Sequence, residues 1–193
     1  MHLEGTVLVG PDFEPVEGRV VVAGGEIVRV EERDVESDDV ILPAFVNAHT
    51  HVGDSIAKEA GEGLSLDELV APPDGLKHRL LRATAREEKV AAMARTLRYM
   101  ESTGTGTFLE FREGGVDGVA ALRDALGGEA AAFGERAIDP VVFGRDDSDV
   151  LSVADGYGAS GARDADFDAV RAAAREAGKP FGIHAGERDA ADI

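Results

Sequence analysis

Two histidines one residue apart, His49 and His51, end a short apolar run that begins at Leu42. Side chains alternate between the two faces of a β-strand, so both imidazoles should point to the same side. Neutral imidazole is a common ligand of zinc and similar ions, so this pair supplies half of a metal site. Asn47 shares their face and either orients a ligand or supports a turn. The alternative is two core histidines, although a buried imidazole without a partner costs free energy.

A second motif lies 133 residues after His51, where residues 179–184 form a strand-like segment that ends in His184, and Glu187 follows in a glycine-containing turn. Only tertiary folding brings residues so distant together. A metal ion lowers the pKa of a bound water, and a nearby carboxylate moves its proton. We therefore expect His49, His51 and His184 to hold one divalent metal ion, zinc first and iron second, with Glu187 as general acid and base. The alternatives are a hydrogen-bonded core histidine and a solvated loop carboxylate.

These motifs resemble those of the amidohydrolase superfamily. Residues 42–51 resemble its first barrel strand, and residues 184–187 resemble the fifth strand of its deaminase-like branch, which adenosine and cytosine deaminases share. The resemblance implies a TIM-type (β/α)8 barrel and a metal-dependent hydrolase of non-peptide carbon–nitrogen bonds. It implies deaminase-like chemistry on a small molecule, an aminated heterocycle or a nucleoside-like compound.

The resemblance also bears on the number of metal ions. Binuclear members of the superfamily use a carboxylated lysine on the fourth strand, and the matching segment here, residues 152–157, has no lysine. We therefore expect a single metal ion. Asp155 in the same segment is a minor alternative ligand.

The order of predicted elements indicates an α/β fold in two domains. Residues 1–40 read as short β-branched strands with a hairpin signal at Gly24-Gly25, a β-sandwich-like segment. A new strand is predicted from Val40 to Val46, and residues 41–193 form the second domain. There, strands alternate with helices, which implies parallel βαβ units. The predicted strands are 107–112, 140–143, 151–157 and 180–184, and the predicted helices are 84–102, 116–126 and 165–177.

The length of the second domain is short for a complete barrel, which takes about 250 residues. Residues 41–193 suffice for about five βα units, so we expect an incomplete, truncated barrel. Other members of the superfamily carry a further histidine on the sixth strand and an aspartate on the eighth, both beyond Ile193. The alternative function is therefore a non-catalytic remnant or an interaction module. Its barrel would be completed by self-association or by a complementing chain.

Four more residues are candidates for substrate binding. Glu110 and Arg112 share one face of a predicted strand, and the apolar Leu109 and Phe111 share the other. Because helices cover the outside of a barrel, we expect the apolar pair to point outward and the charged pair inward. There the charged pair either holds substrate or forms a buried ion pair. Lys77 and His78 lie in a long connection of the kind that lines barrel active sites, and the alternative is a solvated surface pair.

A competing motif spans Gly156 to Gly161, which matches G-x-G-x-x-G after a strand. In a dinucleotide-binding fold such glycines let pyrophosphate approach a helix N-terminus. Here Asp164 and Asp166 follow, and their charge would repel phosphate. We therefore favour loop glycines at the end of a strand.

The composition excludes several classes of protein. With 38 acidic and 20 basic residues, the net charge is −18, and only four residues are lysines. This balance favours a halophilic protein, with an ordinary acidic cytosolic protein as the alternative, and it disfavours binding to nucleic acid. The absence of cysteine excludes disulfides and thiolate metal sites. No signal peptide or apolar run long enough to cross a bilayer is visible, so we expect a cytoplasmic protein that does not bind membranes.

Overall fold

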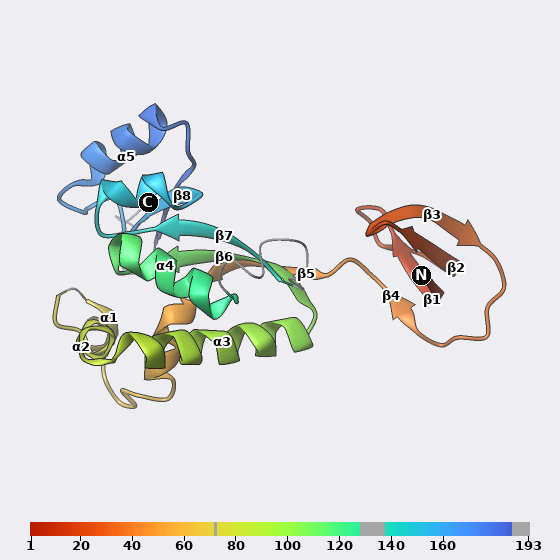
Figure 1. Cartoon of the computed structure of the whole chain (residues 1–193), viewed down its shortest axis with the longest axis horizontal. Helices are drawn as coiled ribbons and strands as arrows, with labels where there is room; N and C mark the ends of the chain where they lie inside the picture. The colour runs from red at the N-terminus through yellow and green to blue at the C-terminus, as the bar shows by residue number, and fades with distance from the viewer. Residues whose placement is uncertain (72, 128–137, 187–193) are drawn as a thin grey trace. The chain divides into compact units, whose positions relative to one another are not determined.

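A computed structural model of the chain describes residues 1–71, 73–127 and 138–186. The chain divides into two compact units, Met1–Ala44 and Phe45–Ile193, which Figure 1 shows in the colours of the chain order. The first unit consists of strands, and the second alternates strands with helices.

The first unit is a four-stranded sheet in the order β3-β2-β1-β4. Its strands are β1 (His2–Val9), β2 (Glu14–Ala23), β3 (Glu26–Glu32) and β4 (Val40–Ile41). β2 and β3 pair antiparallel around Gly24 and Gly25, whose positive φ angles of 61° and 82° suit a tight hairpin turn. The predicted hairpin is thus confirmed. Val7 and Val20, only 5% and 3% exposed, form the buried face of this sheet.

The predicted single strand from Val40 to Val46 was wrong. Val40 and Ile41 form β4, which pairs parallel to β1 in the first unit, whereas β5 (Phe45–Thr50) belongs to the second unit. Pro43 lies between them. Proline has no N–H to donate to a ladder and fixes its φ angle, so the apolar run is divided between two sheets.

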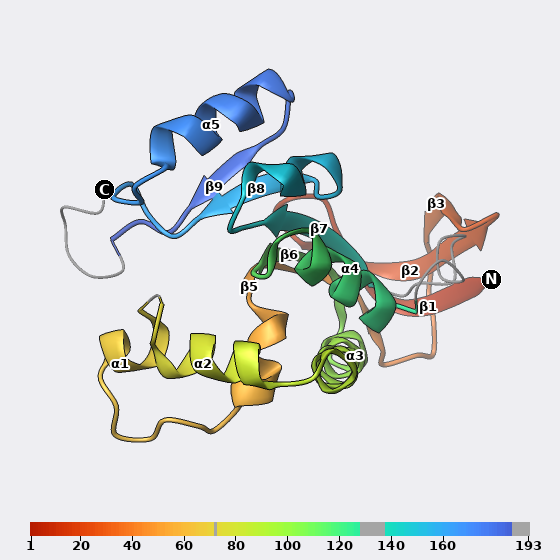
Figure 2. The same ribbon diagram turned by 60° about the vertical axis from the view of Figure 1, so that its left-hand side comes forward.

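The second unit contains a five-stranded parallel sheet whose spatial order, β5-β6-β7-β8-β9, equals the chain order. Right-handed crossovers between strands in such an order place every helix on one face of the sheet. Figure 2 shows α3 and α4 along the same side of the sheet. This is the arrangement of one part of a TIM-type barrel, as predicted. The bounds are β6 (Thr105–Arg112), β7 (Asp139–Gly144), β8 (Gly156–Ala159), β9 (Phe181–Ile183), α3 (Arg86–Ser102), α4 (Gly115–Ala125) and α5 (Phe167–Glu176).

Short helices fill two of the connections. The segment after β5 contains η1 (Val52–Ala57), α1 (Leu66–Val70) and α2 (Leu76–Ala83), and η3 (Ser148–Ser152) precedes β8. The prediction of a strand over residues 151–157 was therefore wrong for residues 151–155, because β8 begins only at Gly156. The side chain of Asp147 accepts a hydrogen bond from the N–H of Asp149, which caps η3 and favours a helical turn over a strand.

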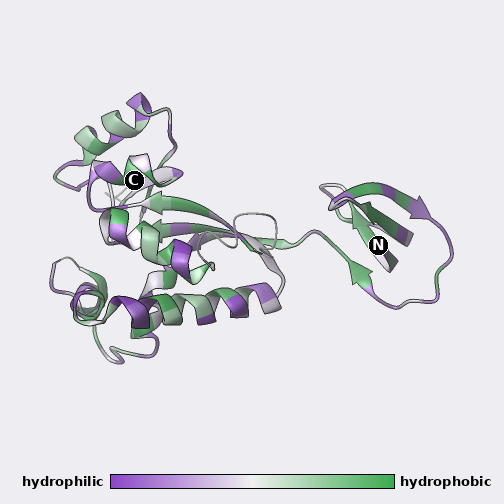
Figure 3. Ribbon diagram, in the orientation of Figure 1, coloured by the Kyte–Doolittle hydropathy of each residue, from purple (hydrophilic) through white to green (hydrophobic). Residues whose placement is uncertain are grey.

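The main core lies between the sheet and helices α3 and α4. Phe108 of β6 and Val119 and Leu122 of α4 are completely buried, and Met93 of α3 is 1% exposed. Figure 3 shows hydrophobic residues along β6 and β7 and a mixture of hydrophilic and hydrophobic residues along α3. This packing fixes the strands whose carboxyl ends carry the candidate site. Among the described residues, no helix combines the length and apolar character needed to cross a bilayer.

Candidate active site

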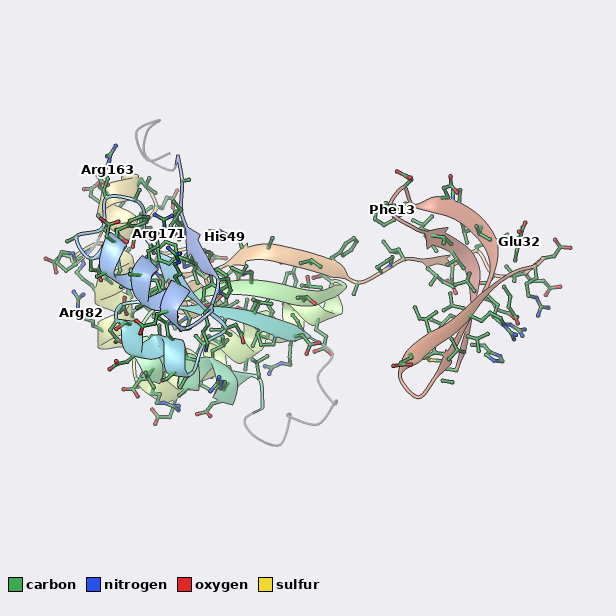
Figure 4. All side chains as sticks on the ribbon, turned by 90° about the horizontal axis from the view of Figure 1, so that it is seen from above. Phe13, Glu32, His49, Arg82, Arg163 and Arg171 are labelled. Carbon is green, nitrogen blue, oxygen red and sulfur yellow. The ribbon has the colours of Figure 1, made fainter. Side chains whose placement is uncertain are left out.

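Three histidines from opposite edges of the sheet meet at the carboxyl ends of its strands. His49 lies near the end of β5, and His51 and His184 follow directly after β5 and β9. The Nε2 atom of His51 lies 3.3 Å from Nε2 of His49 and 3.1 Å from Nε2 of His184. Figure 4 labels His49 at this end of β5, beside β9. The three ligand atoms all lie within 4.8 Å of one another, so the expected histidine cluster forms.

The other ring nitrogen of two of these histidines is engaged by an acceptor. His184 Nδ1 donates a hydrogen bond to the backbone carbonyl of Ala159, at 3.1 Å. His51 Nδ1 lies 3.2 Å from the Oε1 atom of Glu113. Acceptors at Nδ1 hold the proton on that nitrogen, and they leave the lone pair of Nε2 free. Both Nε2 atoms are therefore prepared to bind a cation.

The spacing of the Nε2 atoms suits a zinc-like ion. Nitrogen ligands at ~2.0–2.1 Å from a tetrahedral ion lie ~3.3 Å from one another. The separations of 3.3 Å and 3.1 Å between His51 Nε2 and the other two Nε2 atoms agree with that value, and all three ligand atoms lie within 4.8 Å of one another. Burial lowers the pKa of His184, which keeps its imidazole neutral, the form that ligates metal. The residues present therefore fit one divalent metal ion.

A single aromatic ring forms the floor of the cluster. The ring of Phe111, 5% exposed, has its centroid 5.0 Å from His49, 5.8 Å from His51 and 4.7 Å from His184. Gly158 of β8 makes room for this ring, because a Cβ atom there would lie 2.5 Å from Phe111 Cδ1. The histidines are thus packed from below by one side chain of β6.

A cluster of charged side chains lies at the Nδ1 side of His51. Glu113 is the first residue after β6, and its Oε1 atom accepts from Lys77 Nζ at 2.6 Å and from Arg145 Nη1 at 3.1 Å, besides facing His51. Burial alone would raise the pKa of Glu113. The hydrogen bond with His51 and the two cations outweigh burial and hold this pKa well below its usual range. Lys77 also forms an ion pair with Asp54, at 2.9 Å.

The predicted orientation of β6 was wrong. Thr50 pairs with Glu110 across the ladder, and Thr50 points away from the face that carries His49 and His51. Glu110 and Arg112 therefore face the helices, where Arg112 contacts Met93 of α3. On the helix side, Glu110 and Arg112 both have hydrogen-bond partners. The opposite face of β6 carries the apolar ring of Phe111, which packs against the histidines.

Of the two alternatives for Glu110 and Arg112, the geometry favours the buried ion pair. The two side chains are 0% and 5% exposed, and Arg112 Nη1 lies 3.4 Å from Glu110 Oε1. The other carboxylate oxygen of Glu110 accepts hydrogen bonds from Thr50 Oγ1 at 2.7 Å and from the N–H of Val52 at 2.8 Å. Burial raises the pKa of Glu110 to about 7 although Arg112 lowers it, so the pair is fully charged only above that pH. Direct contact of this pair with a ligand at the histidines is not supported.

The remaining candidates have separate surroundings. The ring of His78 lies apart from the three histidines, with Nε2 3.1 Å from the carbonyl of Val70. Asp155 accepts the N–H of Val142 at 2.8 Å and is not part of the histidine cluster. Glu187 lies outside the described residues.

The G-x-G-x-x-G motif has a packing explanation. Gly156 and Gly158 lie within β8, and a Cβ atom at Gly156 would lie 2.8 Å from the ring of Phe143. The next helix, α5, begins only at Phe167. Gly156 and Gly158 therefore leave room for aromatic rings packed against β8. The motif does not begin a helix, as a pyrophosphate site requires.

Two site residues were missed from the sequence, Glu113 and Arg145. Each is the first residue after a parallel strand, β6 and β7 respectively, as His184 is after β9. The signal that could have found them is this position, because the carboxyl ends of barrel strands converge at one edge.

Residues 40–192 match the model of the Amidohydrolase family. A protein of Methanothermobacter thermautotrophicus named "Putative aminohydrolase" is 34% identical over 202 residues, covering 95% of this chain and 53% of that protein. A protein of the same name from Archaeoglobus fulgidus is 36% identical over 173 residues, covering 87% and 49% respectively. The chain thus spans about half the length of the curated relatives it matches.

Solved structures show the same fold at low sequence identity. The 5-methylcytosine deaminase of Klebsiella pneumoniae liganded with phosphonocytosine superposes with a TM-score of 0.66 at 16% identity, covering 97% of this chain and 52% of that one. Atrazine chlorohydrolase of Arthrobacter aurescens complexed with zinc gives a TM-score of 0.61 at 15% identity, covering 97% and 53%. N-isopropylammelide isopropylaminohydrolase of Burkholderia multivorans gives 0.64 at 18% identity, covering 95% and 52%.

Proposed function

Because the chain belongs to the amidohydrolase family, we propose that it is part of a metal-dependent hydrolase of non-peptide carbon–nitrogen bonds, with deaminase-like chemistry. The observation that carries this proposal is the cluster of His49, His51 and His184, whose Nε2 atoms face one another. Since the chain spans about half of its relatives, the proposal concerns the whole protein to which these residues belong.

The proposed cofactor is one divalent ion, with zinc preferred over iron. His49, His51 and His184 would hold it through their Nε2 atoms, and the hydrogen bonds at Nδ1 of His51 and His184 would fix two of the rings. When bound, the ion supplies Lewis-acid chemistry and lowers the pKa of a water molecule. The preference for zinc is supported by the fit of the nitrogen spacing and by the zinc in the structure of atrazine chlorohydrolase.

The proposed proton carrier is Glu187, which follows His184 by three residues. In this role its carboxylate takes a proton from water and delivers it to the leaving nitrogen, so that ammonia or an amine departs. Of the other candidates, Lys77 does not contact His51 through any of these bonds. It donates a hydrogen bond to Glu113, and Glu113 in turn contacts His51. His78 is not proposed to touch substrate at the histidines, because its ring bonds to the backbone of Val70.

The proposed substrate is a small aminated heterocycle or a nucleoside-like compound. Support comes from the names of two proteins that share the fold, 5-methylcytosine deaminase and N-isopropylammelide isopropylaminohydrolase. A working environment of high salt is also proposed, because the net charge is −18.

Metal analysis tests this function first. The purified chain, stripped with a chelator and reloaded, should bind about one zinc ion, and the triple variant His49→Ala/His51→Ala/His184→Ala should bind none. His78→Ala is the matched control, because it removes an imidazole outside the cluster, and it should bind zinc like the wild type. Equal zinc content in all three proteins would refute the metal site. Ammonia release from a panel of aminated heterocycles by the loaded full-length protein then tests the reaction.

A further inference from the structure

Glu113 is the acceptor at Nδ1 of His51, and its other contacts show how that acceptor is held. Its side chain is 7% exposed, and a single oxygen, Oε1, receives three donors from three separate elements. They are His51 at the end of β5, Lys77 at the start of α2 and Arg145 after β7. The second oxygen, Oε2, is buried and has no hydrogen-bond partner among the described residues.

We infer that Glu113 is a positioning residue that fixes the ring and the tautomer of His51, so that Nε2 of His51 points at the site of the metal ion. The inference rests on the proposed function for the existence of that site. A carboxylate that accepts a proton-bearing nitrogen of a ligating histidine raises the basicity of the histidine and holds its ring in place. The 3.2 Å separation between His51 Nδ1 and Glu113 Oε1 is that contact.

Lys77 and Arg145 make the acceptor role of Glu113 permanent. Both side chains are 12% exposed, and both direct a cationic nitrogen at the same oxygen that faces His51. A carboxylate between two cations remains ionised, and an ionised carboxylate accepts hydrogen bonds without donating any. In the neutral imidazole, His51 then carries its proton on Nδ1 and the lone pair on Nε2. Glu113, Lys77 and Arg145 thus set the tautomer of His51 through a contact at Nδ1 alone.

The role is distinguishable from that of a simple bridge between cations. Glu113 also lines a cavity of about 630 Å³ beside α2, α3 and α4, and Asp117 of α4 lines the same cavity without contacting the histidines. Asp117 is exposed and lies four residues after Glu113 in the chain, in the first turn of α4. The variant Asp117→Asn therefore removes the same charge nearby and serves as the matched control.

The decisive experiment measures zinc affinity and the tautomer of His51 in the same set of proteins. Competition with a chromophoric chelator should show zinc binding about 10–100-fold weaker in Glu113→Ala than in the wild type. Glu113→Gln keeps the volume and one acceptor and should fall between them, and Asp117→Asn should match the wild type. Nitrogen-15 spectra of the imidazoles in the metal-free protein should show the Nδ1–H tautomer of His51 in the wild type and a mixture in Glu113→Ala.

Each contrary outcome identifies its cause. If both Glu113 variants lose thermal stability but bind zinc like the wild type, with the His51 tautomer unchanged, Glu113 is only a bridge and the inference is overturned. If Glu113→Ala does not fold, Glu113→Gln provides the same two measurements. Should the wild type bind zinc no better than the triple histidine variant, the proposed function itself fails. The tautomer measurement, which needs no metal, still tests Glu113.

Discussion

The hydroxyl of Thr50 lies 2.7 Å from the carboxylate of Glu110, and both side chains are buried on the face of the sheet opposite the histidines. The N–H of Val52 reaches the same oxygen at 2.8 Å. Residues directly before and after His51 are thus tied to β6 on the helix side. The cluster of histidines is held from behind by these bonds and from below by Phe111.

The stability of the fold should depend on the protonation of Glu110. Burial raises the pKa of Glu110 from 4.5 to about 7, so the folded chain holds a proton that the unfolded chain releases between these values. The free energy of unfolding should therefore fall as the pH rises from about 4.5 to 7, and the loss should be complete above that range. Glu110→Gln has no such proton to release.

Urea unfolding of the wild type and of Glu110→Gln at several pH values between about 5 and 8 checks this expectation. The difference in unfolding free energy, wild type minus variant, should decrease with rising pH. All other titrating groups are common to both proteins, so their contributions cancel in the difference. Parallel curves would show that the carboxyl of Glu110 titrates at its ordinary pKa.

Removal of one imidazole from the cluster should abolish most zinc binding. His184→Ala deletes the single ligand from the far edge of the sheet and leaves the β5 pair, which offers two nitrogens only. Calorimetric titration with zinc should show a large loss of affinity for His184→Ala and an unchanged affinity for His78→Ala. Similar losses in both variants would indicate that zinc binds without selection for the cluster.

A methyl group at Gly158 should disturb the floor of the site. The added Cβ would lie 2.5 Å from Phe111 Cδ1, closer than atoms can approach, so the ring or β8 must move. We expect Gly158→Ala to cost about 1–3 kcal/mol of unfolding free energy. The control is Gly161→Ala, where the nearest atom within 4 Å is the carbonyl oxygen of His184 at an ordinary 3.7 Å. Guanidinium unfolding should separate the two, and equal midpoints would contradict the tight contact.

Salt should stabilise the chain steeply at first and then weakly. A net charge of −18 repels itself, and added ions screen this repulsion. The screening length falls from about 10 Å at 0.1 M to about 3 Å at 1 M, so most of the gain should come before molar concentrations. Thermal unfolding in a series of potassium chloride concentrations measures the effect. A melting temperature that does not rise would oppose the proposed adaptation to high salt.

The fold was predictable where local sequence and tertiary packing agree. The helix predicted over residues 84–102 corresponds to α3, which begins at Arg86, and the strand predicted over 107–112 corresponds to β6. The approach of His184 to His51 was expected because each lies at the carboxyl end of a strand in one parallel sheet. In the structure their Nε2 atoms lie 3.1 Å apart. In these segments, the pattern of apolar residues predicts the type of element and its approximate bounds.

The errors arose where periodicity leaves a choice open. Strand alternation separates Glu110 and Arg112 from Phe111 but does not say which set faces the helices, and the general rule that apolar residues face the helices failed. Phe111 is required under the three imidazoles, and the buried charges are satisfied by Thr50 and by each other. Glu113 was overlooked because a carboxylate after a strand is common in so acidic a chain, and only its three partners distinguish it.

The alternation along β6 has a consequence for how accurately this region must fold. A slip of one position against β5 would exchange its two faces, placing an acidic and a basic side chain beneath the imidazoles and forcing a phenyl ring among the helices. Because side chains alternate between the faces, every slip by an odd number of positions inverts them. The geometry of the histidine cluster therefore depends on the register of β6, a strand that contributes no histidine to it.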